Sequence, residues 1–209
     1  MNTRTFKKQL RSILARNQLL GASTEPAAIF RRLLKTQEEL GEASEAFLSI
    51  TGPQQENYKG LTVDDLREEV ADVFLMVADV YVRWTKSVYP GCSDDDILDE
   101  LLVFNRYRDE HFYPPVFEPC FVELNGAFGA LFSRAARCWG SPDGLPELGF
   151  RLLMNQLVVA SFWALSVSLP GETFDADERR RRYIELLNDK LNKWARVTGR
   201  PELVEPIIA

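Results

Sequence analysis

Acidic residues recur at helical spacing in two separate stretches of this 209-residue chain. Glu39 and Glu42 lie three residues apart, and Glu69 and Asp72 have the same spacing, so each pair projects from one face of a helix. Other acids stand four residues apart, where like charges cost about 0.2–0.5 kcal/mol per pair. These pairs are Glu38–Glu42, Asp65–Glu69 and Glu68–Asp72. Solvated helix faces normally alternate in charge, so this pattern favours a bound divalent cation.

Carboxylates in this number are hard oxygen ligands, which suit Mg²⁺ or Mn²⁺ better than zinc. We therefore expect a metal centre built from Glu39, Glu42, Glu69 and Asp72, holding one or two cations. Such a cation lowers the pKa of a bound water. The alternative is an ordinary solvated face of glutamates, on which Lys35 relieves part of the repulsion at Glu39.

The order of these acids resembles a known signature. Residues 38–42 read EELGE and residues 69–72 read EVAD, with 26 residues between them. This resembles the EExxE…ExxD signature of the MazG-like all-α NTP pyrophosphohydrolases, relatives of the all-α dimeric dUTPases, over about residues 30–117. The resemblance implies hydrolysis of a nucleoside triphosphate between its α and β phosphates, which gives a monophosphate and pyrophosphate.

The same resemblance implies roles for individual residues. The four acids would ligate Mg²⁺, with Mn²⁺ as a substitute, and Glu38 would orient or deprotonate the attacking water. Lys35, Asn105 and Arg108 would contact phosphate or sugar. Members of this family assemble from several hairpins, so we expect a homodimer or a higher homo-oligomer. The base pocket is made by side chains outside the motif, so the preferred base and sugar stay open.

Helical periodicity dominates the sequence, and hairpin dipeptides between alternating apolar runs are absent, so we predict an all-α fold. Helices 26–51 and 62–89 are joined by a short connection and should pack antiparallel, which brings the acid pairs level. We expect Glu69 and Asp72 to be half buried at the edge of an apolar stripe. The predicted helices cover residues 5–20, 26–51, 62–89, 93–111, 121–138, 146–169 and 175–198.

Two halves of the chain resemble each other. Residues 39–49 match residues 123–133 at five of eleven positions, and residues 104–108 resemble 191–196 at a similar separation. This indicates a duplicated helical hairpin whose copies pair as a four-helix bundle, although chance similarity between amphipathic helices is the alternative. Residues 1–117 would carry the site, and residues 118–209 would be a degenerate repeat packed on them in one compact unit. Gly126 stands where Glu42 would be, so we expect no metal in the second half.

The composition narrows the function further. A net charge of −6 argues against nucleic acid or an anionic membrane as a partner of the whole protein. Three widely spaced cysteines and one histidine argue against a disulfide framework and a zinc cluster and fit a cytoplasmic protein. We read the apolar segment 152–169 as a core helix, and Ser93 as a helix cap in preference to part of a metal loop. A catalytically idle helical bundle that senses nucleotide or serves assembly is the alternative to an enzyme.

Overall fold

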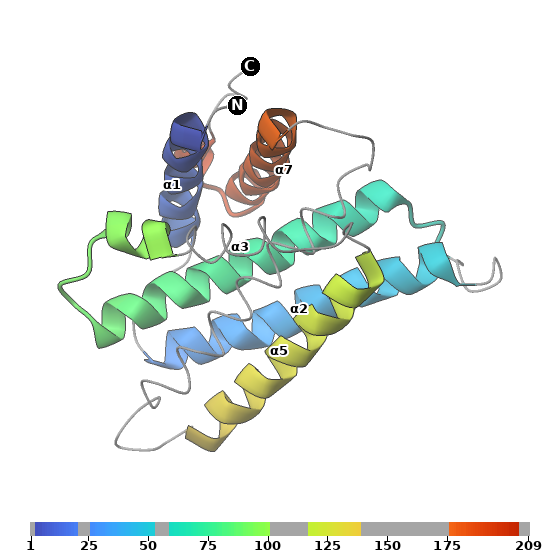
Figure 1. Ribbon diagram of the computed structural model, residues 1–209, viewed down its shortest axis with the longest axis horizontal. Coiled ribbons are helices and arrows are strands. Elements are labelled where there is room, and N and C mark those ends of the chain that lie inside the picture. The colour runs from blue at the N-terminus through green and yellow to red at the C-terminus, as the bar shows by residue number, and fades with distance from the viewer. Residues whose placement is uncertain (1–2, 21–25, 53–58, 101–116, 139–175, 205–209) are drawn as a thin grey trace.

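The computed structural model describes residues 3–20, 26–52, 59–100, 117–138 and 176–204, and these residues are helical apart from short connections (Figure 1). The helices are α1 (Thr3–Leu20), α2 (Pro26–Thr51), α3 (Val63–Val88), α5 (Phe117–Cys138) and α7 (Ala176–Val197), followed by the short 3-10 helix η1 (Pro201–Leu203). Residues 94–100 are also helical, and no strand occurs within the described ranges. The prediction of an all-α fold is confirmed.

The observed helix ends lie close to the predicted ones. Helix α2 begins and ends at the predicted residues, and α1, α3 and α7 differ by at most two residues at either end. Helix α5 begins four residues earlier than predicted, with Pro119 in its first turn, where a missing backbone N–H breaks no helical hydrogen bond. The predicted helix 146–169 lies outside the described residues, as does the part of helix 93–111 beyond residue 100.

Two acidic residues near helix starts act as caps. The Asp65 carboxylate accepts a hydrogen bond from the Thr62 backbone N–H at 2.7 Å, and the Thr62 hydroxyl accepts one from the Asp65 N–H at 3.3 Å. This capping box starts α3. Ser93 and Asp96 make the same reciprocal pair at 3.1 and 3.2 Å. The predicted cap at Ser93 is therefore confirmed, and it uses Asp96 for capping.

Helix α3 is the centre of the fold. It lies between α2 on one side and α1 and α7 on the other, and α5 lies across α2 (Figure 1). Every residue from 70 to 85 is buried. The sequence predicted a single apolar stripe on this helix, and that prediction was too narrow because α3 is covered by helices on opposite sides.

The second half of the chain contacts the first through α5, which packs on α2, and through α7, which packs on α1 and α3. Phe121 of α5 packs against Phe47 of α2, with ring centroids 5.4 Å apart. Gly126 is exposed, and a Cβ added there would meet no atom within 4 Å. The intended partner of α5, residues 146–169, lies outside the described residues. The four-helix bundle and the duplication of the hairpin therefore stay predictions.

A buried ion network joins α2 to α3. The Asp79 side chain is fully buried, and its carboxylate lies 2.9 Å from Arg83 Nε and 2.9 Å from Arg32 Nε. Arg83 also donates to the Gln18 carbonyl of α1 at 3.1 Å. Separating a buried charge from its counterion is strongly destabilising, so the contact between Arg32 and Asp79 restricts how α2 and α3 slide along one another. Because α2 and α3 are antiparallel, seven residues onward from Arg32 on α2 correspond to seven residues back from Asp79 on α3. These steps lead to Glu39 and Asp72.

Replacing Asp79, whose carboxylate both arginines share, tests how much this network stabilises the fold. We expect Asp79→Asn to lower the free energy of unfolding by about 3 kcal/mol, because two guanidinium groups lose their buried counterion. The matched control is Lys7→Gln, which removes an exposed ion pair to Asp99 and should cost less than about 1 kcal/mol. Urea unfolding of both variants measures the difference. A loss below 1 kcal/mol in Asp79→Asn would contradict the assigned role.

Candidate metal centre

Three carboxylates from two helices converge at the interface of α2 and α3. One oxygen each from Glu39, Glu69 and Asp72 lies within 4.8 Å of the other two. Glu39 and Asp72 are buried and Glu69 is half-buried. Mg²⁺ binds oxygens at about 2.0–2.1 Å, so ligand oxygens around one ion lie up to roughly 4 Å apart. Small rotations of these side chains would bring the three oxygens to one cation.

The other residues predicted for the site are less close or fall outside the described chain. Glu42 is exposed and is not part of the three-residue cluster, although its charge helps to raise the pKa of Glu69. Glu38 is exposed at the rim, where Lys35 Nζ lies 3.0 Å from its carboxylate. Asn105 and Arg108 lie outside the described residues. The structure thus brings together three of the four predicted ligands.

Lys190 enters this cluster from α7, and the sequence analysis missed it. Its Nζ lies 2.6 Å from Asp72 Oδ2 and 3.2 Å from Glu68 Oε2, and its side chain is 5% exposed. One signal was present in the sequence. Lys190 continues the row of Tyr183 and Leu187, at positions i, i+4 and i+7, and both of these side chains are buried. A lysine on an apolar helix face requires a buried anionic partner.

Nearby lysine side chains weaken the inference of a bound metal that was drawn from repulsion between these acids. Asp65 serves as a cap, and Glu68 shares Lys190 and Lys193, with Lys193 Nζ at 3.2 Å. Lys35 Nζ lies 2.9 Å from Glu39. The like-charge pairs along each helix are therefore partly compensated by side chains of the protein itself. They do not by themselves require a metal, and the case for a cation depends on the three-carboxylate cluster.

Burial and mutual repulsion disfavour the ionised form of the carboxylates in this cluster. The pKa of Glu69 is raised to about 7, mainly by burial. Lys190 lowers this pKa, whereas the carboxylates of Asp72, Glu42 and Glu39 contribute to its increase. Burial also raises the pKa of Asp72 to about 6, against the lowering effect of Lys190. Asp72 Oδ1 is buried without a hydrogen-bond partner. An unsatisfied carboxylate oxygen beside two further carboxylates fits a divalent cation.

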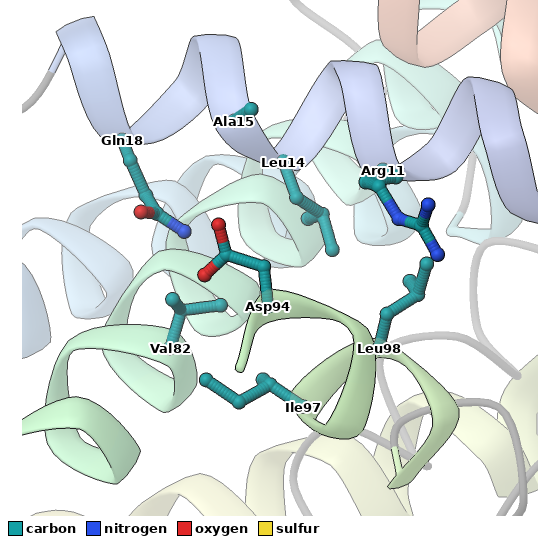
Figure 2. A pocket seen from close by; sticks show the side chains of 8 residues that line it. All are labelled: Arg11, Leu14, Ala15, Gln18, Val82, Asp94, Ile97 and Leu98. Carbon is teal, nitrogen blue, oxygen red and sulfur yellow. The ribbon is translucent and has the colours of Figure 1, made fainter. Parts of the chain in front are cut away.

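A small cavity lies elsewhere in the fold. Figure 2 shows side chains from α1, α3 and residues 94–98 around it, with Gln18, Asp94 and Arg11 as its polar groups. Its volume is about 20 Å³, which is enough for about one water. Val82 in its wall lies ten residues along α3 from Asp72, or about 15 Å. This cavity is too small and too distant to form part of the acidic site.

Comparison of the chain with models of protein families, with curated proteins and with solved structures found no match in any of the three. Within the described ranges, no helix is both long and apolar enough to cross a membrane. The apolar segment 152–169 lies outside those ranges. The side chain of Cys92 is half-buried.

The raised pKa of Glu69 predicts a pH-dependent stability of the metal-free protein. The folded state binds this proton more tightly than the unfolded state, in which the pKa is near 4.5. The stabilising effect is complete below pH 4.5 and is lost as the pH rises through about 7. After allowance for solvent screening, we expect a loss on the order of 1 kcal/mol between pH 5 and 8.

Urea unfolding in EDTA at pH 5 and pH 8 measures this loss. Glu69→Gln should show a smaller decrease than the wild type, because its amide does not titrate. Glu45→Gln is the matched control, since Glu45 lies on α2 outside the cluster and pairs with Lys59 at 2.7 Å. An undiminished decrease in Glu69→Gln would show that the pH dependence arises elsewhere.

Proposed function

We propose that this protein hydrolyses a nucleoside triphosphate to a monophosphate and pyrophosphate with the help of Mg²⁺ or Mn²⁺. The observation that carries the proposal is the convergence of Glu39, Glu69 and Asp72 across two antiparallel helices. These residues stand in the order of the EExxE…ExxD signature described above. The proposal joins a geometry that suits a hard cation to a sequence pattern that resembles a family using one.

Glu39, Glu69 and Asp72 would hold the cation, with Glu42 at the rim. When bound, the cation would neutralise phosphate charge, polarise the phosphorus and acidify a water. The exposed carboxylate of Glu38 would orient that water or accept its proton. Lys35, which pairs with Glu38 and Glu39 at 3.0 and 2.9 Å, would turn toward an incoming phosphate. Its side chain is 43% exposed, so this movement requires little desolvation.

A second candidate is a catalytically idle helical module that senses nucleotide or takes part in assembly. The ion pairs of Lys190 with Asp72 and of Lys35 with Glu39 favour it, because two of the three carboxylates then have an internal counterion. Two observations favour the metal-dependent enzyme: Asp72 Oδ1 is buried without a hydrogen-bond partner, and the pKa of Glu69 is raised to about 7, mainly by burial. Homo-oligomeric assembly and a cytoplasmic location stay predictions under either function.

Pyrophosphate release from a panel of NTPs and dNTPs, with Mg²⁺ and with EDTA, tests the proposal. We expect release that depends on Mg²⁺, and a decrease of about 100-fold or more in Glu39→Gln and in Asp72→Asn, because each removes an anionic ligand. Glu123→Gln is the matched control: Glu123 aligns with Glu39 in the repeat and is exposed on α5. It should keep wild-type activity.

Two outcomes would count against the enzyme. Wild-type turnover in Asp72→Asn would remove the acidic cluster from the mechanism. The absence of Mg²⁺-dependent release with every nucleotide would favour the idle module.

A further inference from the structure

The placement of Lys190 suggests how the acidic cluster is kept stable without a metal. The ammonium lies between Asp72 and Glu68, at 2.6 and 3.2 Å, on a residue that is 4% exposed. It comes from α7, whereas the carboxylates of the cluster come from α2 and α3. A helix distant in sequence therefore supplies a positive charge to the site.

Helix α7 is held so that this charge stays in place. Arg16 of α1 donates to the side-chain oxygen of Asn192 at 3.2 Å and to that of Asn188, and it reaches the Leu203 carbonyl at 3.3 Å. Asn188 and Asn192 stand two residues before and after Lys190, which places them on the opposite side of the helix. Arginine contacts on one side of α7 and the lysine on the other fix the helix between α1 and α3.

Lys190 and a divalent cation would compete for the same carboxylate. The ammonium contacts Asp72 Oδ2, while Oδ1 of the same carboxylate is buried without a partner. A cation bound through Asp72 would lie within a few ångströms of Nζ, where two positive charges repel strongly in a buried environment. The ammonium also neutralises part of the negative charge that would attract a divalent cation.

We propose that Lys190 is a built-in competitor of the divalent cation, and that metal binding displaces its ammonium from Asp72 and weakens the contact between α7 and α3. This inference rests on the proposed metal site. In the metal-free protein the ammonium stabilises the buried acids. In the metal-bound protein the cation takes over that role, so the affinity for metal is set by the exchange of one cation for the other.

A purely structural lysine makes a different prediction from a competitor. If Lys190 only supports the fold, removing its charge leaves metal affinity unchanged or lowers it. If it competes, removing its charge raises metal affinity although the metal-free protein becomes less stable. The gain in affinity is therefore the informative readout.

Calorimetric titration of the full-length chain with Mn²⁺ tests the proposal. We expect Lys190→Met to bind Mn²⁺ at least about tenfold more tightly than the wild type, because the repelling charge is gone. Lys190→Arg, which keeps the charge, should bind no more tightly than the wild type. Lys193→Met is the matched control, since Lys193 lies on the same helix, contacts Glu68 at 3.2 Å and is 62% exposed. Its affinity should change by less than about threefold because exposed charges are screened.

Lys190→Gln guards against misfolding, because its amide is uncharged and still donates a hydrogen bond to Asp72. Tighter Mn²⁺ binding by either folded variant supports the proposal, as does binding by a variant when the wild type binds none. Wild-type binding with unchanged or weaker binding in both neutral variants overturns the competition and leaves the metal site intact. No Mn²⁺ binding by the wild type or by any Lys190 variant overturns the metal site and the competition together.

Discussion

The register in which α2 packs on α3 depends on one buried ionic contact. Asp79 lies between Arg32 of α2 and Arg83 of its own helix with no exposure of its side chain, so sliding either helix would break the Arg32–Asp79 ion pair, which is the part of the network that crosses between them. The same register places Glu39 of α2 beside Asp72 of α3, because Glu39 lies seven residues after Arg32 and Asp72 lies seven residues before Asp79 on antiparallel helices. The acidic cluster and the covering helices α1 and α7 are all arranged around a pair of helices held in this way.

The cluster concentrates carboxylates where burial penalises them, and the protein offsets that penalty with side chains from elsewhere. Lys35 reaches Glu39 along the same helix, and Lys190 reaches Asp72 from α7. The remaining imbalance appears in the raised pKa of Glu69, about 7. Under the proposed function, such an arrangement would fold without a metal and would still attract one. Compensation by lysines that a cation would displace connects these two requirements in the proposal.

The sequence predicted the local features well because they depend on neighbouring residues. Turn residues and periodicity gave the helix limits, and the i,i+3 spacing of Glu69 and Asp72 gave their shared face. The resemblance to the EExxE…ExxD signature and the expected antiparallel packing of the two helices predicted that Glu39 joins Glu69 and Asp72 in one cluster. The sequence missed Lys190 because its contact with Glu68 joins residues 122 positions apart, and no local pattern states which helix covers a given face. The burial of α3 on opposite sides was missed for the same reason.

The position of a bound manganese ion tests the central claim most directly. Crystals of the full-length protein grown with Mn²⁺ should give an anomalous-scattering peak at about 2 Å from carboxylate oxygens of Glu39, Glu69 and Asp72. In the same crystals Lys190 Nζ should have left Asp72. A cluster without a manganese peak at millimolar Mn²⁺, with Lys190 still paired to Asp72, would contradict the account.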